Sequence, residues 1–408
     1  MTELGERERL TGGRAGVVVV LLTLAMLTST FPGFAFGVIA PQLTDEFGLT
    51  RAALGVLSTV YFVVGGLGSV LAGRIVDAIG ARRVMLASFV ILVVSMVGLG
   101  LSPSYPLLMF AALLAGFSLA TGNPVSNKII VERIPTARRG MAMGVKQAGV
   151  QAGAFVAGGA LGPAAAVFGW RTAVIATAAL PLAGAIGTLI AVPRDVVMGR
   201  SERRSLRVKV SRPIRRLAVY GFLMGLAVSN VNAYLPLFAV EDVGLSTVRA
   251  GALIAVMGVF GMVMRVVWGW MSDRSGRFRG YLTWMAAGGA VSILAAVVTS
   301  VAGLAPWLLW LVAIGLGVTA VTWLSVAMVA VIASSRPANA GHASGVVLLG
   351  FYSGFLPGPV VFGALVDVTG TYTVSWILVI VAFVASAGLM SRPWPQYDPD
   401  DPSPVRAG

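Results

Sequence analysis

Apolar residues dominate the chain in long runs, and short polar segments separate one run from the next. Twelve of these runs reach about 20 residues, the length that an α-helix needs to cross the hydrocarbon core of a bilayer. The pattern therefore predicts an all-α membrane protein with twelve transmembrane helices. They are expected at approximately 16–40, 51–73, 83–101, 105–130, 140–167, 172–192, 216–238, 250–271, 281–301, 305–333, 341–366 and 372–391.

The composition agrees with a membrane protein and excludes several classes of site. Of the 408 residues, 57% are hydrophobic and only 11% are charged, against roughly 25% charged residues in soluble domains. There is no cysteine, which excludes disulfides and thiolate metal sites, and His342 is the single histidine. No nucleophile, metal-ligand cluster or acid–base pair is indicated within the helices. We therefore expect neither an enzyme nor a bound cofactor.

Lysine and arginine gather on one side of the predicted helices. With the N-terminus placed inside, most of the 30 basic residues fall in inside segments, whereas outside loops keep Arg51, Arg171 and Arg249. The positive-inside rule then predicts a multi-pass protein of the cell membrane with both termini cytoplasmic. This topology accounts for the net charge of +14 without a nucleic-acid partner. The basic run at 200–216 is expected to contact anionic lipid headgroups.

The longest polar connection, at 193–215, divides the chain into two parts of six predicted helices each. We expect an N-terminal bundle at 16–192 and a C-terminal bundle at 216–391. A cytoplasmic N-terminus is expected at 1–15, and the tail at 392–408, which is rich in proline and aspartate, is expected to be disordered and cytoplasmic. We expect the protein to be a monomer.

Glycines recur in the same order in both parts, which predicts two parallel structural repeats. One group matches at an offset of 196 residues and a second group at an offset of 201 residues. The first group pairs Gly48, Gly55, Gly73 and Gly80 with Gly244, Gly251, Gly269 and Gly276. The second pairs Gly140, Gly144, Gly149, Gly153 and Gly169 with Gly341, Gly345, Gly350, Gly354 and Gly370.

A polar loop after the second helix, GRIVDAIGARR at 73–83, recurs after the eighth as GWMSDRSGRFR at 269–279. The first glycine of each copy permits close helix approach, and the second permits a tight turn. The aspartate of each copy lies at a helix end, where it can pair with arginines or cap a neighbouring helix. The candidate gating residues are Gly73, Asp77, Gly80, Arg82, Arg83, Gly269, Asp273, Arg274, Gly276 and Arg279.

This loop resembles the signature loop of the major facilitator superfamily, and with twelve spans in two halves the resemblance covers essentially the whole chain. It implies the major facilitator fold and a cytoplasmic latch that breaks and reforms as the halves rock. The alternative is that these residues fix only topology and the turn. The first copy departs from the family at Ala78, where Arg or Lys is usual.

Three cations remain inside the predicted helices or near their ends, whereas no Asp or Glu lies mid-helix: Lys128, Lys146 and Arg265. Inserting such a charge costs at least about 2.5–3.5 kcal/mol, so water, an amide or an anionic substrate must offset it. The repeat provides an internal control, because Lys146 corresponds to Val347 and Arg265 to Ser69. The fold therefore does not require these charges, which favours a substrate site. Lys128 lies near its helix end and is expected at the interface.

Two further resemblances bear on the substrate. Arg265 in RVVWG is similar to the eighth-helix arginine of oxalate/formate antiporters and monocarboxylate transporters, where it binds the substrate carboxylate. A guanidinium fork suits that role, although Arg265 could instead extend to the headgroups. The stretch around Lys146 resembles a cyanate-permease-like branch. The segment 158–171 matches only part of the fifth-helix motif of drug–proton antiporters. The other candidate substrate contacts are Gln147, Gln151, Asn123, Asn127 and Tyr352.

Together these features predict a secondary active or facilitative transporter of a small organic anion, such as a mono- or dicarboxylate, working by alternating access. Two alternatives stay open. One is an efflux transporter for amphipathic drugs, with Trp268, Trp270 and Trp323 lining an apolar pocket. The other is a transporter-like sensor without flux. Because no carboxylate lies within the helices, the coupling ion is not indicated.

Overall fold

The computed structural model describes residues 12–193, 211–334 and 340–392, and in these ranges the regular structure is entirely helical. Twelve helical segments there are long and apolar enough to cross a membrane, as the sequence pattern predicts. The predicted tail and most of the predicted linker lie outside the described residues. The helices are α1 (Gly12–Val38), α2 (Ala40–Phe47), α3 (Arg51–Ile79), α4 (Ala81–Leu101), α5 (Tyr105–Arg133), α6 (Thr136–Val156), η1 (Ala157–Leu161), α7 (Gly162–Phe168), α8 (Trp170–Thr177), α9 (Ala179–Ala191), α10 (Arg212–Glu241), α11 (Thr247–Ser275), α12 (Phe278–Val301), α13 (Leu308–Val318), α14 (Trp323–Ala333), α15 (Ala340–Gly354), α16 (Gly358–Thr369) and α17 (Thr373–Ser391).

Several spans that the apolar pattern predicts as single helices are interrupted. The fifth span is α6, the π-helical turn η1 and α7, and the eleventh is α15 and α16 with a break between them. The tenth span, α13 and α14, breaks at residues 319–322. At this break the hydroxyls of Thr319 and Thr322 donate hydrogen bonds to the carbonyls of Gly315 and Val318, four residues earlier, at 2.6 and 2.9 Å. The break at 319–322 contains the Val321 carbonyl, which accepts hydrogen bonds from side chains.

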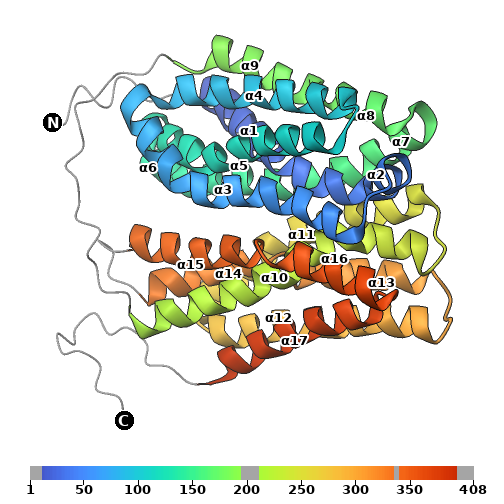
Figure 1. Cartoon of the computed structure of the whole chain (residues 1–408). Helices are drawn as coiled ribbons and strands as arrows, with labels where there is room; N and C mark the ends of the chain where they lie inside the picture. Colours follow the sequence, from blue (N-terminus) through green and yellow to red (C-terminus); the bar gives the residue numbers. More distant parts are fainter. Residues whose placement is uncertain (1–11, 194–210, 335–339, 393–408) are drawn as a thin grey trace, which may run out of the picture.

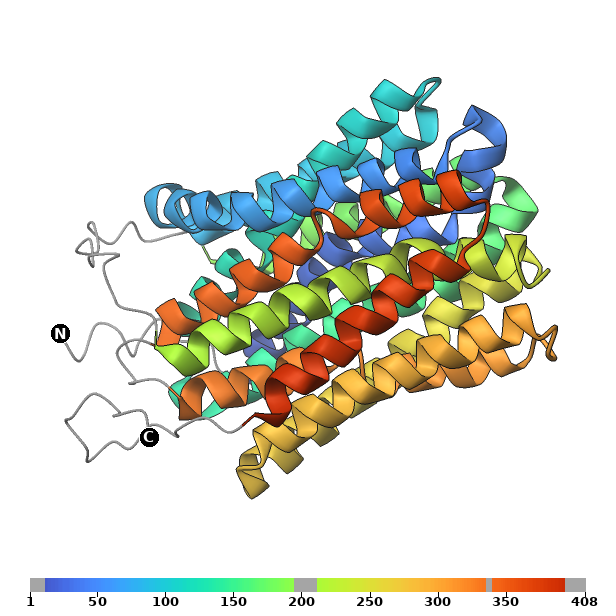
Figure 2. The same cartoon turned by 60° about the horizontal axis from the view of Figure 1, so that its bottom comes forward.

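The two halves of the chain form two layers of helices (Figure 1). Helices α1 to α9 lie in one layer and α10 to α17 in the other, and the helices run roughly along one common direction (Figures 1 and 2). We call the end of the bundle at which α9 ends and α10 begins the inner end, and the opposite end the outer end. The inner end corresponds to the side that the basic residues predict to be cytoplasmic.

At the outer end, α3 and α16 hold the two halves together. A Cβ added at Gly55 would lie 2.3 Å from the Pro359 carbonyl oxygen, and one at Gly363 would lie 2.3 Å from the Arg51 carbonyl oxygen. Only glycine allows the two backbones to come this close. The Asp367 carboxylate at the end of α16 accepts hydrogen bonds from the first backbone N–H groups of α3. The outer end is therefore closed by contacts between the halves.

At the inner end the halves do not approach each other in this way, which corrects one expectation from the sequence. A Cβ added at Gly73 would meet nothing within 4 Å, and one at Gly269 would meet only the Ser325 Cβ, at 3.9 Å. The close helix approach expected at these glycines is therefore wrong for this conformation, because no described residue of the other half lies within 4 Å of either Cβ position. The tight turns are confirmed, with φ of +98° at Gly80 and +64° at Gly276.

Several charged residues of the two loops contact residues of their own halves. Lys128 lies 2.9 Å from the Asp77 carboxylate, and this pair places Lys128 at the inner helix ends as expected. Arg82 donates to the Leu189 carbonyl and Arg279 to the Ser391 carbonyl, which caps the last turns of α9 and α17. Arg274 stacks over Trp270, and Arg83 and Asp273 are exposed. The latch between the halves stays a prediction.

Candidate functional site

A cavity of about 370 Å³ lies between the two halves, within the range of small-molecule sites. Helices α1, α3, α5 and α6 line it from one half, and α10, α11, α14 and α15 from the other. All seven residues predicted to contact substrate lie in its wall. They are Asn123, Asn127, Lys146, Gln147, Gln151, Arg265 and Tyr352.

Lys146 extends from α6 toward α5 and is 1% exposed. Its ammonium donates to three neutral oxygens, Asn123 Oδ1 at 3.3 Å, Ser126 Oγ at 2.8 Å and Asn127 Oδ1. Ser126 and Asn127 follow Asn123 by three and four residues, about one turn of α5, so neighbouring positions on one side of the helix receive all three N–H groups. In the described residues Lys146 has no carboxylate partner. Its positive charge is hydrogen-bonded but not neutralised.

Lys146 also orients the two amides that it contacts. Because Asn123 and Asn127 accept through their oxygens, their NH₂ groups must point away from the ammonium. In the described part of the chain neither amide nitrogen has a hydrogen-bond partner, and both residues line the cavity. The sequence placed these residues among the candidates but did not reveal this arrangement, and it missed Ser126 altogether. The result is a pair of N–H donors available to a ligand.

Arg265 extends from α11 into the cavity and contacts the interruption in the tenth span. Its Nη2 donates to the Val321 carbonyl at 3.1 Å, and Gln151 Nε2 reaches the same oxygen at 3.4 Å. This carbonyl lies in the interruption between α13 and α14. Arg265 Nε is buried and has no hydrogen-bond partner among the residues that the structure describes. Arg265 therefore faces the cavity in this structure and does not extend to the headgroups.

Further polar atoms around the cavity are buried without partners. The side-chain oxygens of Gln147, Gln151 and Asn232 have none. Leaving such atoms unpaired costs about 1–3 kcal/mol each, so a cluster of them in one cavity wall is typical of a binding site. Gln147 and Gln151 share one face of α6, whereas Lys146 points away toward α5, as the helical spacing predicts.

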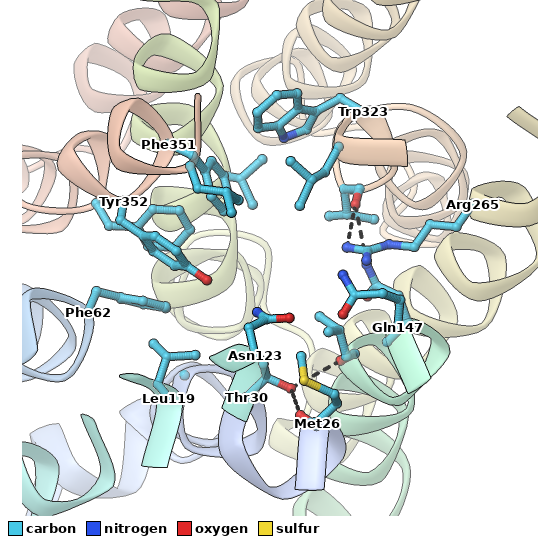
Figure 3. Close-up of a pocket in the computed structure, with 18 of the residues that line it drawn as sticks. Met26, Thr30, Phe62, Leu119, Asn123, Gln147, Arg265, Trp323, Phe351 and Tyr352 are labelled. Carbon is cyan, nitrogen blue, oxygen red and sulfur yellow. Dashed lines mark hydrogen bonds between the residues drawn. The ribbon is translucent and has the colours of Figure 1, made fainter. Parts of the chain in front are cut away.

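Aromatic side chains form the opposite wall, which the sequence did not identify as a unit. Figure 3 shows Phe62, Phe351 and Tyr352 facing Arg265 and Gln147 across the cavity, with Trp323 above. Ring centroids in this wall lie 5.2 Å apart for Trp323 and Phe351. The residues come from three different helices, so no periodicity within one helix could have grouped them.

Two of the three tryptophans, and also Tyr234, lie outside the cavity wall. Among the three tryptophans proposed for an apolar pocket, only Trp323 lines the cavity. Trp268 donates to the Val318 carbonyl, and Trp270 is 61% exposed. Tyr234 bonds at the outer contact between the halves, to the Arg51 and Pro359 carbonyls.

The family model of the Major Facilitator Superfamily matches residues 22–333. The chain belongs to the major facilitator superfamily. Its fold and family are those of membrane transporters and not of enzymes. Among solved structures, the superfamily member is similar to a bacterial homolog of the human lysosomal transporter Spinster in an inward-facing and occupied conformation. The TM-score is 0.75 at 18% identity, covering 94% of this chain and 97% of that chain.

Two relatives of this major facilitator protein have assigned transport functions. The gallate transporter of Pseudomonas putida is 25% identical over 62% of this chain and 66% of its own length, so the chain spans slightly less than two thirds of that relative. The probable nitrate/nitrite transporter NarK2 of Mycobacterium tuberculosis is 27% identical over 88% of this chain and 92% of its own length. At these identities the comparisons show the family and leave the substrate open.

Proposed function

We propose that this major facilitator protein transports a small organic anion, such as a mono- or dicarboxylate, by alternating access. One observation carries the proposal: Lys146 and Arg265 line the cavity, and no Asp or Glu is among its described lining residues. An anion gains from both charges, whereas a cation would meet uncompensated repulsion. We place the protein in the cell membrane as a monomer, with its termini cytoplasmic and two six-helix bundles at 16–192 and 216–391.

The chemistry of the cavity supports an anion with an aromatic or flat apolar body. Arg265 offers a planar fork with an unpartnered Nε, and the amides of Asn123 and Asn127 add N–H donors. The wall that contains Phe62 and Phe351 can pack against an apolar body. The substrates named for the two relatives described above, gallate and nitrate or nitrite, are also anions.

The arrangement of the halves supports alternating access with the site reached from the inner end. Contacts between α3 and α16 close the outer end, whereas in the described part of the chain no residue of the other half lies within 4 Å of a Cβ built at Gly73 or Gly269. Asn127, in the cavity wall, is exposed and lies less than two turns before the inner end of α5, which supports access from the inner side. We propose that the outer contacts break when the inner end closes, and that the polar loops at 73–83 and 269–279 then act as the latch.

Thermal unfolding of the purified protein tests the anion proposal. A ligand at 100 times its Kd stabilises the folded state by about 2.7 kcal/mol. We expect benzoate, benzenesulfonate, succinate or nitrate to raise the Tm, and glucose and tetraphenylphosphonium to leave it unchanged. Arg265→Gln should weaken binding of the stabilising anion at least 10-fold, because a charge-assisted hydrogen bond contributes about 1.5–3 kcal/mol. Arg249→Gln, which removes an exposed cation at the start of α11, is the matched control and should bind normally.

The competing proposal of drug efflux has a clear signature in the same experiment. Stabilisation by tetraphenylphosphonium alone, unaffected by Arg265→Gln, would favour a pocket that works through its aromatic wall. Binding of an anion without flux in liposomes would instead favour a transporter-like sensor.

A further inference from the structure

Anion binding explains the charge of Lys146 in the loaded cavity, but it does not explain an ammonium at this position in the empty one. Arg265 could provide a positive charge by itself. The position in the second half that corresponds to Lys146 is Val347, which is buried and apolar. A permanently charged ammonium that is 1% exposed, without a carboxylate partner, would burden the empty site with a second desolvated cation. The empty and the loaded site therefore favour different protonation states of Lys146.

We propose that Lys146 is a proton-binding site that couples transport of the anion to transport of one proton. The inference rests on the proposed anion transport and goes beyond it by naming the coupling ion and its carrier. The neutral amine of Lys146 takes one proton from water on the outer side when the anion binds, so the loaded state holds an ammonium beside the anion. After the anion leaves, the ammonium transfers its proton to water at the inner end, and the empty protein returns with a neutral amine at Lys146.

The partners of Lys146 suit both of its protonation states. As an ammonium it donates to the oxygens of Asn123, Ser126 and Asn127. A neutral amine has two N–H donors and one lone pair, and the two amide oxygens can keep the two donors. The Ser126 hydroxyl, which now donates to the Gly122 carbonyl at 2.6 Å, can rotate and donate to that lone pair. A carboxylate partner would hold the proton in place, and the described residues supply none.

Charge balance follows from this cycle. A bound monoanion plus the protonated Lys146 has the same net charge as the empty cavity with a neutral Lys146. Arg265 stays charged in both states, since arginine does not lose its proton in proteins. The other titratable groups of the cavity wall are Tyr61 and Tyr352, and outside it Lys128 is paired with Asp77. In the described part of the wall, Lys146 is thus the group whose protonation can change the net charge of the site.

Proteoliposomes with a pH-sensitive dye inside test the coupling, with benzenesulfonate as the probe because this anion stays ionised and carries no proton itself. Exchange of labelled for unlabelled benzenesulfonate needs only the loaded protein, whereas net uptake also needs the empty protein to return. For the wild type we expect exchange, net uptake, and acidification of the lumen by one proton per anion. Net uptake should be insensitive to an imposed membrane potential.

Lys146→Arg separates the two activities, because arginine keeps the positive charge but cannot release the proton. We expect net uptake to fall at least 10-fold more than exchange does, so the ratio of net uptake to exchange drops relative to the wild type. Lys146→Met should weaken both. Wild-type net uptake without acidification, or net uptake by Lys146→Arg at the wild-type rate, would overturn proton coupling while leaving anion transport intact. Absence of exchange in the wild type would overturn the proposed function, and this inference with it.

Discussion

Removing the Asp367 carboxylate should open the outer end of the protein. The backbone N–H groups of Arg51 and Ala52 donate to this carboxylate at 3.0 and 2.8 Å. Thr50, in the same half as α3, caps only the next N–H, that of Ala53. Asp367 thus completes the N-terminal cap of a helix that belongs to the other half, and it can do so only while the outer end is closed.

The magnitude follows from the energetics of helix caps. Replacing a capping side chain by alanine costs about 0.5–2 kcal/mol. Because water satisfies the same N–H groups when the halves separate, nearly all of this cost falls on the outer-closed state. A change of about 1 kcal/mol shifts the ratio of the two states about 5-fold. Asp367→Asn keeps one acceptor oxygen and should give a smaller shift.

Spin-label distance measurements across the outer end can resolve this shift. The chain has no cysteine, so Ser104→Cys in the first half and Ala302→Cys in the second introduce the only two labelling sites, both exposed. Asp367→Ala should raise the ratio of long to short distances about 5-fold. The control is Asp242→Ala, since Asp242 bonds to Ser300 within one half. An unchanged distribution in Asp367→Ala, or an equal shift in the control, would refute the reasoning.

Two further predictions concern stability. Gly158→Ala should lower the Tm, because its Cβ would lie 2.2 Å from the Gly251 carbonyl oxygen of the other half. Gly144→Ala, with open space around the added Cβ, should raise the Tm because it removes a glycine from within a helix. Equal changes in Tm for the two variants would contradict the packing argument. The Arg171 guanidinium, which donates to Glu46, holds the pKa of that carboxyl below its ordinary value. The ion pair therefore stabilises the protein above the ordinary pKa of about 4.3, and this stabilisation is lost as the pH falls through the lowered pKa. Glu46→Gln should lower the Tm at pH 7 and should lower it progressively less below about pH 4. A Tm difference that does not depend on pH would contradict this ion pair.

The sequence predicted the polar side of the cavity because symmetry between the repeats marks the exceptions. Lys146 stands where the second half has Val347, and Arg265 where the first half has Ser69. Such differences can be read from the sequence, because the recurring glycines align the positions of one half with those of the other. The aromatic wall had no such mark, because Phe62 and Phe351 are ordinary apolar residues of their helices.

The contacts that close the outer end were beyond the sequence for a different reason. Asp367 and Arg51 are 316 positions apart, and nothing local in either segment indicates the other. The glycines at Gly55 and Gly363 fit several helix pairs equally well. Whether two helices meet depends on which way the halves lean, and that conformation is not encoded in the periodicity of any one span. The division into bundles and the latch at the polar loops stay predictions.

The interruptions of the fifth and eleventh spans bear on how the molecule changes shape. At the offset of 201 residues, η1 (Ala157–Leu161) corresponds to residues 358–362, the first residues of α16, directly after the break between α15 and α16. Each half therefore has a joint at nearly the same depth. The segments beyond the joints, α7 and α16, meet α11 and α3 of the opposite half, whereas α6 and α15 line the cavity. A bend at either joint would let the cavity wall close around a ligand while the outer contacts stay in place. We therefore expect closure in two stages, a local bend that encloses the substrate and then a rotation of whole halves.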